Sequence, residues 1–208
     1  MAEQKKGWFI QNLANLITVL GLISSLWLFI IGVSYPDMLW LVLVLGIVAG
    51  LSDFLDGKIA RRLNIRTPFG VTMDRIRDKI FVCLTLGLLA WQYRPNNGNR
   101  ILSTLTETLV VLIIILEILI FSTHVYGLYK KNNVSAGQNG KIKMFGEFFA
   151  IAFWLISLNI DKYFSLNSFS YIAYLVASVL IASFFFGAKG FAIYCQKYSQ
   201  PQRPKEQL

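Results

Sequence analysis

The chain is poor in the residues that build zinc sites, cross-links and soluble surfaces. Its 208 residues include two cysteines, one histidine and five prolines, and only 15% are charged, against about 25% in an average soluble domain. One histidine and two cysteines are too few for a conventional zinc site. Cys83 and Cys195 belong to apolar segments, so we expect packed thiols and no disulfide.

Apolar residues dominate what is present. They make up 55% of the chain, and the mean hydropathy is +0.55. Since a bilayer core of about 30 Å takes about 20 apolar residues per helix, we predict an all-α integral membrane protein with six transmembrane helices. The predicted spans cover about residues 11–33, 37–64, 70–94, 101–129, 141–160 and 168–194.

The predicted organisation is one membrane domain, residues 11–195, with a short polar segment at each end. Residues 1–10, with Trp8 and Phe9, read as an interfacial N-terminal segment and not as a cleaved signal. Residues 196–208 read as a polar cytoplasmic tail.

Basic residues predict the orientation. With both termini in the cytoplasm, 17 of the 20 Lys and Arg residues lie on the cytoplasmic side, as the positive-inside rule requires. This distribution explains the net charge of +9 without a nucleic-acid partner. The basic face is expected to meet anionic lipid headgroups or phosphorylated substrates.

Four of the six aspartates lie in one stretch, Ser52–Ile80, between long apolar runs. Asp53 follows Asp37 by 16 residues, or about 24 Å of helix, and Asp78 precedes Tyr93 by 15 residues, or about 22 Å. Glu117 should reach a similar depth in the fourth span. All these acids are therefore expected near the cytoplasmic end of the hydrocarbon layer, where a carboxylate needs a cation or a cavity.

The spacing of the aspartates predicts a common site. Asp53 and Asp56 are three residues apart and Asp74 and Asp78 are four apart, so each pair shares one helix face. Residues Asn64–Phe69, which include Pro68, are expected to turn the chain between the two helices. Four clustered carboxylates repel one another unless divalent cations lie among them, and two Mg²⁺ or Mn²⁺ ions would suit this number of oxygen ligands.

Simpler interpretations of these residues stay open at this point. Glu117 could pair with a base such as Lys143, and Lys141 and Lys143 could be ordinary cytoplasmic-side residues. Buried acids in six spans also suit a small cation channel or transporter, although these acids cluster at one end of two spans. The aspartates could instead be structural partners of neighbouring arginines, namely Arg61, Arg62, Arg75 and Arg77.

The aspartates belong to a longer pattern, Asp53-x2-Asp56-Gly57-x2-Ala60-Arg61-x8-Gly70-x3-Asp74-x3-Asp78. This complete pattern resembles the signature of the CDP-alcohol phosphatidyltransferases. The stretch "ANLITVLG" is similar to a family segment with Asn15 and Thr18, although Ala14 replaces the usual proline and Gly21 stands where some members have arginine. The stretch "NGKIKMFGEF" is similar to a Gly-Lys-x-Lys-Thr segment of phosphatidylglycerophosphate synthases, with Met144 in place of threonine.

The resemblance implies a reaction and roles for the matched residues. A phosphatidyl group would pass from CDP-diacylglycerol to a small alcohol acceptor with release of CMP, at an active site facing the cytoplasm. Glycerol 3-phosphate is the best candidate acceptor, with inositol phosphate, serine or phosphatidylglycerol as alternatives. The family also implies a homodimer and two divalent ions.

In this interpretation Asp53, Asp56, Asp74 and Asp78 hold the metals, and Asp78 is also the candidate base. Acceptor binding falls to Lys141, Lys143 and Glu117. Gly46 and Gly50 would let the second span pack closely beside the site. The expected nucleotide-binding residues are Asn15, Thr18, Gly57, Ala60, Arg61 and Gly70.

Overall fold

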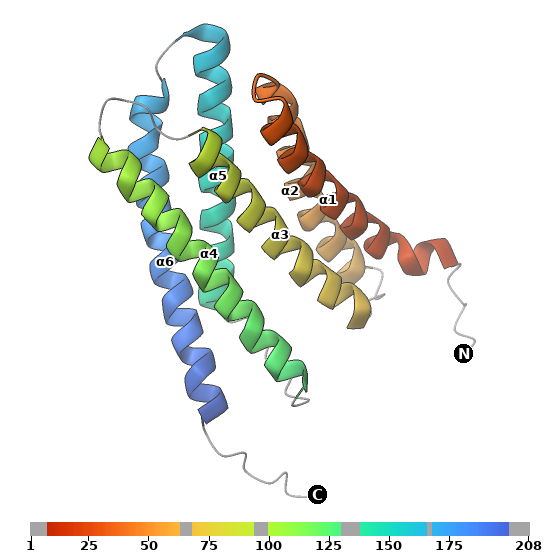
Figure 1. The fold of residues 1–208 in the computed structure, drawn as a ribbon. Helices are drawn as coiled ribbons and strands as arrows, with labels where there is room; N and C mark the ends of the chain where they lie inside the picture. The colour runs from red at the N-terminus through yellow and green to blue at the C-terminus, as the bar shows by residue number, and fades with distance from the viewer. Residues whose placement is uncertain (1–7, 63–67, 94–99, 130–137, 166–167, 200–208) are drawn as a thin grey trace, which may run out of the picture.

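The computed structural model describes residues 8–62, 68–93, 100–129, 138–165 and 168–199, and these residues form six α-helices (Figure 1). The all-helical prediction is confirmed. The predicted N-terminal segment and tail lie largely outside the described residues. The helices are α1 (Trp8–Ser34), α2 (Leu39–Arg62), α3 (Pro68–Gln92), α4 (Arg100–Tyr129), α5 (Gln138–Phe164) and α6 (Ser168–Ser199).

Helix α3 begins earlier than the sequence suggested. Its first residue is Pro68, so the expectation that Asn64–Phe69 are all turn is wrong at its C-terminal end. Proline suits the first helical position, because its fixed φ fits a helix and its missing N–H is not needed there. The rest of the predicted turn, residues 64–67, lies outside the described residues.

Four helical segments in the described part of the chain are long and apolar enough to cross a bilayer. The apolar part of α2 is shorter, Leu39–Asp53, and α3 carries five charged residues from Asp74 to Lys79. Six crossings and the orientation remain predictions. Large apolar side chains such as Trp27, Ile118 and Phe185 are exposed on the helices, as expected for contact with lipid. The four segments are Asn15–Ser34, Arg100–Gly127, Gln138–Phe164 and Tyr171–Gln196.

The helices form two groups that meet through α3 and α5. Helix α1 packs against both α2 and α3, and α6 packs against both α4 and α5 (Figure 1). Contacts of α3 with α4 and α5, and of α2 with α5, join the groups. The apolar core runs through this junction and includes Leu86 of α3, Ile113 of α4 and Leu180 of α6, all fully buried.

Two polar side chains of α5 tie it to the ends of α2 and α3. The buried Trp154 indole donates a hydrogen bond to the Tyr93 carbonyl at 3.1 Å. The Asn159 amide donates to the Leu39 carbonyl at 3.2 Å and to Leu155 within its own helix at 2.9 Å. The Trp154 bond satisfies a backbone carbonyl just beyond the C-terminal end of α3, where a helix leaves carbonyls without partners.

Glycines allow the closest helix contacts. A Cβ on Gly46 would lie 3.2 Å from Leu155 of α5, and a Cβ on Gly50 would collide with the Phe148 ring of α5. The prediction that these two glycines let the second helix pack closely is therefore confirmed. On α1, a Cβ at Gly32 would collide with Leu88, a side chain of α3 that is 1% exposed.

Neither cysteine forms a disulfide, as predicted. Cys83 is partly buried in α3, but Cys195 is exposed on the last turns of α6. The expectation of a packed thiol is thus wrong for Cys195, because an apolar neighbourhood in sequence does not tell which helix face meets another helix.

The close contact of α1 with α3 can be tested with matched alanine variants. Gly32→Ala and Gly87→Ala both gain about 1 kcal/mol of helix propensity. Only Gly32→Ala forces the buried Leu88 to move, because the nearest atom to a Cβ on Gly87 is 3.9 Å away. We expect Gly32→Ala to be less stable than Gly87→Ala by about 1–3 kcal/mol, the usual cost of overpacking. Thermal unfolding in detergent measures this difference, and equal melting temperatures would contradict it.

Candidate active site

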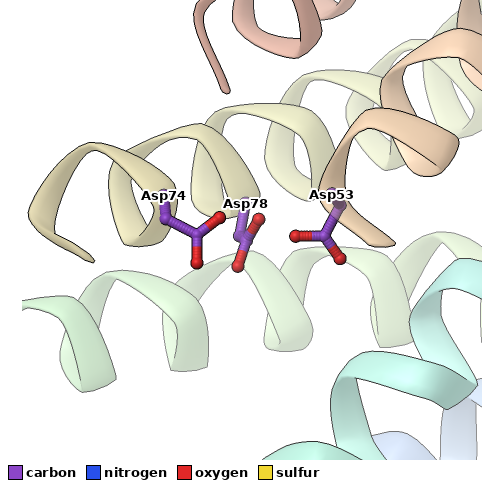
Figure 2. Close-up of side chains that lie close together, drawn as sticks. All are labelled: Asp53, Asp74 and Asp78. Atoms are coloured by element: carbon purple, nitrogen blue, oxygen red, sulfur yellow. The ribbon is translucent and has the colours of Figure 1, made fainter. Parts of the chain in front are cut away.

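Three of the four predicted aspartates converge between α2 and α3. Asp53 lies near the end of the apolar part of α2, and Asp74 and Asp78 lie one turn apart on α3 (Figure 2). One carboxylate oxygen from each lies within 4.8 Å of the other two. The convergence predicted from helical spacing is confirmed for these three residues, which we call the aspartate trio.

The fourth aspartate belongs to the same part of α2. Asp56 lies three residues after Asp53 in this helix, and the placement of its side chain is outside the described residues. Three predicted nucleotide-binding residues, Gly57, Ala60 and Arg61, follow in the same helix, and the structure describes only their backbone. Their roles remain predictions that rest on the motif.

An arginine that the motif does not contain lies at the centre of the trio. Arg77 Nη2 donates to Asp74 Oδ1 at 2.8 Å and to Asp78 Oδ1 at 2.9 Å, and it also contacts Asp53 Oδ1. The Arg77 side chain is 2% exposed, whereas the three carboxylates are partly exposed. The alternative that the aspartates have arginine partners is thus confirmed for Arg77. Its signal in the sequence is its place three residues after Asp74, on the same helix face.

Small residues of α1 leave room for Arg77. A Cβ on Gly21 would lie 3.0 Å from Arg77 Cδ and would collide with the Ser52 hydroxyl of α2, so α1, α2 and α3 meet at this point. Thr18 is buried one helical turn before Gly21, and Asn15 is partly buried one turn earlier. These two predicted nucleotide-binding residues therefore lie on the α1 side of the trio. Gly70 is in the first turn of α3, one turn before Asp74.

The donor set of the trio fits a divalent cation. Carboxylate oxygens are hard ligands of the kind that Mg²⁺ prefers, and three of them lie close enough to share one ion. Partial exposure leaves a path for the ion and for a phosphate ligand. The trio is thus suited to neutralise and position a charged substrate.

A second group of charges lies in the junction of the two helix groups. The Glu117 carboxylate of α4 forms ion pairs with Lys79 of α3 and Lys143 of α5, and Lys143 also pairs with Glu147 Oε1 at 3.1 Å. Glu117, Lys143 and Glu147 are at most 3% exposed. Lys79 is 25% exposed, and we call the four residues the quartet. Two positive and two negative charges balance within it, which lowers the cost of burying each one.

Two of the three predicted acceptor-binding residues, Glu117 and Lys143, belong to the quartet. The alternative in which Glu117 pairs with Lys143 is confirmed. Lys141, two residues earlier on α5, is exposed. Lys79 and Glu147 were not predicted as site residues, although Glu147 lies four residues after Lys143 and therefore on the same face of α5.

Helix α3 connects the two charged groups. Asp78 belongs to the trio, and the next residue, Lys79, pairs with Glu117 of the quartet. Successive helical residues point about 100° apart, so one turn of α3 presents a carboxylate to one group and an ammonium to the other. The quartet therefore adjoins the trio on its α4 and α5 side.

Comparison with known protein sequences covers the same part of the chain. The family model for CDP-alcohol phosphatidyltransferases matches residues 11–187, a range that includes the trio and the quartet. A CDP-diacylglycerol--glycerol-3-phosphate 3-phosphatidyltransferase from Rickettsia typhi is 29% identical over 150 residues, which cover 70% of this chain and 77% of that protein.

Two further relatives carry related names. The protein of the same name from Salmonella choleraesuis is 26% identical over 148 residues, covering 70% of this chain and 76% of that protein. A cardiolipin synthase (CMP-forming) from Streptomyces coelicolor is 35% identical over 86 residues, covering 40% of this chain and 39% of that protein.

The contribution of the quartet to stability can be measured at Glu117. Glu117→Gln leaves Lys79 and Lys143 with less negative charge in a buried place, and removing one partner of a buried pair costs about 3–5 kcal/mol. The control is Glu107→Gln, the same substitution on the same helix at a partly buried position, with an expected cost of about 1 kcal/mol or less. Unfolding in detergent by heat or denaturant compares the two. Equal losses of stability would show that the quartet contributes little.

Proposed function

Because the chain belongs to the CDP-alcohol phosphatidyltransferase family, we propose that it transfers a phosphatidyl group from CDP-diacylglycerol to glycerol 3-phosphate. The acceptor hydroxyl bonds to the phosphorus next to diacylglycerol, the bond from that phosphorus to the CMP oxygen breaks, and CMP leaves. The observation that carries this proposal is the convergence of Asp53, Asp74 and Asp78 within 4.8 Å. The names of two relatives support the choice of acceptor.

The aspartates hold the divalent ions in this proposal. Asp53, Asp56, Asp74 and Asp78 bind two Mg²⁺ or Mn²⁺ ions. Bound ions of this kind neutralise the charge of a diphosphate and of its leaving oxygen. The protein contributes the spacing: two helices, rather than a loop, set the positions of the carboxylates, which favours a fixed geometry.

Asp78 is the proposed base that accepts the proton of the acceptor hydroxyl. Its side chain is the least exposed of the trio, at 17% against 32% for Asp53 and 39% for Asp74. It also lies nearest in sequence to the quartet, where the acceptor is expected. A carboxylate in this position can both contact a cation and reach the incoming hydroxyl.

The nucleotide occupies the α1 and α2 side of the trio in this proposal. Asn15 and Thr18 supply hydrogen-bonding groups from α1, and Arg61 supplies a charge for a phosphate from the last turn of α2. Gly57, Ala60 and Gly70 lack large side chains, so they let the nucleotide approach the helix backbones.

The acceptor occupies the α4 and α5 side. Lys141 is exposed, so its ammonium is available to a phosphate. Lys143 and Glu117 form the wall of this site as a buried pair, joined by Lys79. The match to a cardiolipin synthase supports phosphatidylglycerol as the second candidate acceptor.

In the membrane, we propose six crossings with both termini in the cytoplasm. The trio and quartet then lie near the cytoplasmic surface, where CMP and a phosphorylated acceptor are soluble. The chain is proposed to act as a homodimer, as the family resemblance implies.

The reaction and its acceptor can be tested in one assay of CMP release. The purified protein is given CDP-diacylglycerol with glycerol 3-phosphate, serine, inositol, inositol phosphate or phosphatidylglycerol. We expect the fastest CMP release with glycerol 3-phosphate, and only when Mg²⁺ or Mn²⁺ is present. Undiminished turnover in excess EDTA would rule out the metal mechanism, and CMP release with phosphatidylglycerol alone would reassign the acceptor.

Two aspartate variants separate the base from a metal ligand. Asp78→Asn keeps the size of the side chain but cannot accept the proton, so kcat should fall by about 10²–10⁴ while the nucleotide lipid still binds. Asp53→Asn should instead weaken metal-dependent binding of the nucleotide lipid together with the rate. Thermal shift with Mg²⁺ and CDP-diacylglycerol measures binding, and single-turnover kinetics measure the rate. If both variants lose binding equally, Asp78 is chiefly a metal ligand and the base lies elsewhere, with Glu117 the next candidate.

A further inference from the structure

We propose that the Arg77 guanidinium is a displaceable internal cation that competes with divalent metal for the aspartate trio. The proposal rests on the metal site proposed above and adds a residue outside the family motif. It implies that Arg77 weakens metal binding and thereby sets the metal concentration at which the site fills.

The position of one nitrogen carries the argument. Arg77 Nη2 contacts Oδ1 of all three aspartates. Mg²⁺ binds carboxylate oxygens at about 2.1 Å. Arg77 Nη2 lies 2.8 Å from Asp74 Oδ1 and 2.9 Å from Asp78 Oδ1. An ion bound to either oxygen therefore lies at most about 5 Å from this nitrogen. At this distance the ion and the guanidinium repel each other, and both are attracted to the same carboxylates.

The charge of Arg77 cannot be removed by losing a proton. A guanidinium stays protonated in proteins, so the conflict is resolved only by movement of the side chain. Four aspartates and two divalent ions already balance in charge. A guanidinium retained among them leaves an excess positive charge in a place where Arg77 is 2% exposed.

In this proposal the guanidinium of Arg77 moves, while the aliphatic part of its side chain stays in place. Arg77 Cδ lies beside Gly21, where a Cβ would approach it to 3.0 Å, so α1 packs closely against the stem. The guanidinium beyond Cδ can turn away from the carboxylates by rotation about its last bonds while the stem keeps its contact with α1.

Arg75 provides the matched control. It lies two residues before Arg77 on the same helix and is partly buried. Arg75→Gln removes the same charge from the same turn of α3, so it reports the general effect of charge on metal binding. Arg77→Gln removes the same charge and also removes the group that competes directly with the metal for the trio.

The purified protein in detergent is titrated with Mn²⁺ alone. Isothermal titration calorimetry measures the dissociation constant. A charge-assisted hydrogen bond contributes enough to change a dissociation constant about tenfold to hundredfold. We therefore expect Arg77→Gln to bind Mn²⁺ about 10–100 times more tightly than the unaltered protein. Arg75→Gln should stay within about threefold. In EDTA, Arg77→Gln should also unfold at a lower temperature, because the trio has lost its counter-ion.

Arg77→Lys keeps the test available if Arg77→Gln does not fold. Lysine retains the charge but lacks the planar fork of arginine, so a smaller gain in Mn²⁺ affinity is expected. Unchanged or weaker Mn²⁺ binding in the Arg77 variants would overturn the competition.

One further variant separates this proposal from the metal site itself. Asp53→Asn should abolish or strongly weaken Mn²⁺ binding in the Arg77→Gln background, which places the ion at the trio. If neither the unaltered protein nor Arg77→Gln binds Mn²⁺, the proposed metal site fails and the competition fails with it. If the unaltered protein binds Mn²⁺ and Arg77→Gln binds it equally, only the competition fails.

Discussion

Charge compensation in a low-dielectric interior is the constraint on which the rest of this structure depends. A carboxylate or ammonium group loses its hydration when it is buried, and this loss costs several kcal/mol unless an opposite charge lies beside it. The described part of the chain meets this requirement in two adjacent places. Arg77 lies among three aspartates, and Glu117 pairs with Lys79 and Lys143 while Lys143 also pairs with Glu147. Helix α3 supplies residues to both.

The two charged groups differ in their burial, and the difference matches their proposed roles. Three of the four quartet residues are at most 3% exposed, which favours a fixed connection between the two helix groups. The three carboxylates of the trio surround the buried guanidinium of Arg77 and are themselves partly exposed. Carboxylates with access from outside are suited to take up cations, whereas buried pairs of opposite charge are suited to hold helices together.

Small residues decide where these charges can meet. Gly21 on α1 leaves the space that the stem of Arg77 fills, next to Ser52 of α2. Gly187 on α6 likewise leaves space for Lys143 of the quartet, since a Cβ there would lie 2.8 Å from Lys143 Cδ. Large side chains at either position would move a charged residue away from its partners. The glycines thus act on the electrostatics of the site through packing.

The sequence by itself determined the helical class, the positions of most helices and the helix faces shared by Asp53 with Asp56 and by Asp74 with Asp78. These features follow from apolar length and from the three- and four-residue spacing of one helix face, which are local properties of the chain. Only the tertiary structure decided which charges meet across helices. The sequence offered Arg61, Arg62, Arg75 and Arg77 as partners of the aspartates, and the placement of α2 beside α3 adds Asp53 to the contacts that Arg77 makes within α3. Glu117 of α4 likewise pairs with Lys79 of α3 and Lys143 of α5 because these helices pack together at that depth, whereas Glu147 and Lys143 pair within α5. Periodicity gives the face on which a residue lies, but the rotation and spacing of helices distant in sequence decide what that face meets.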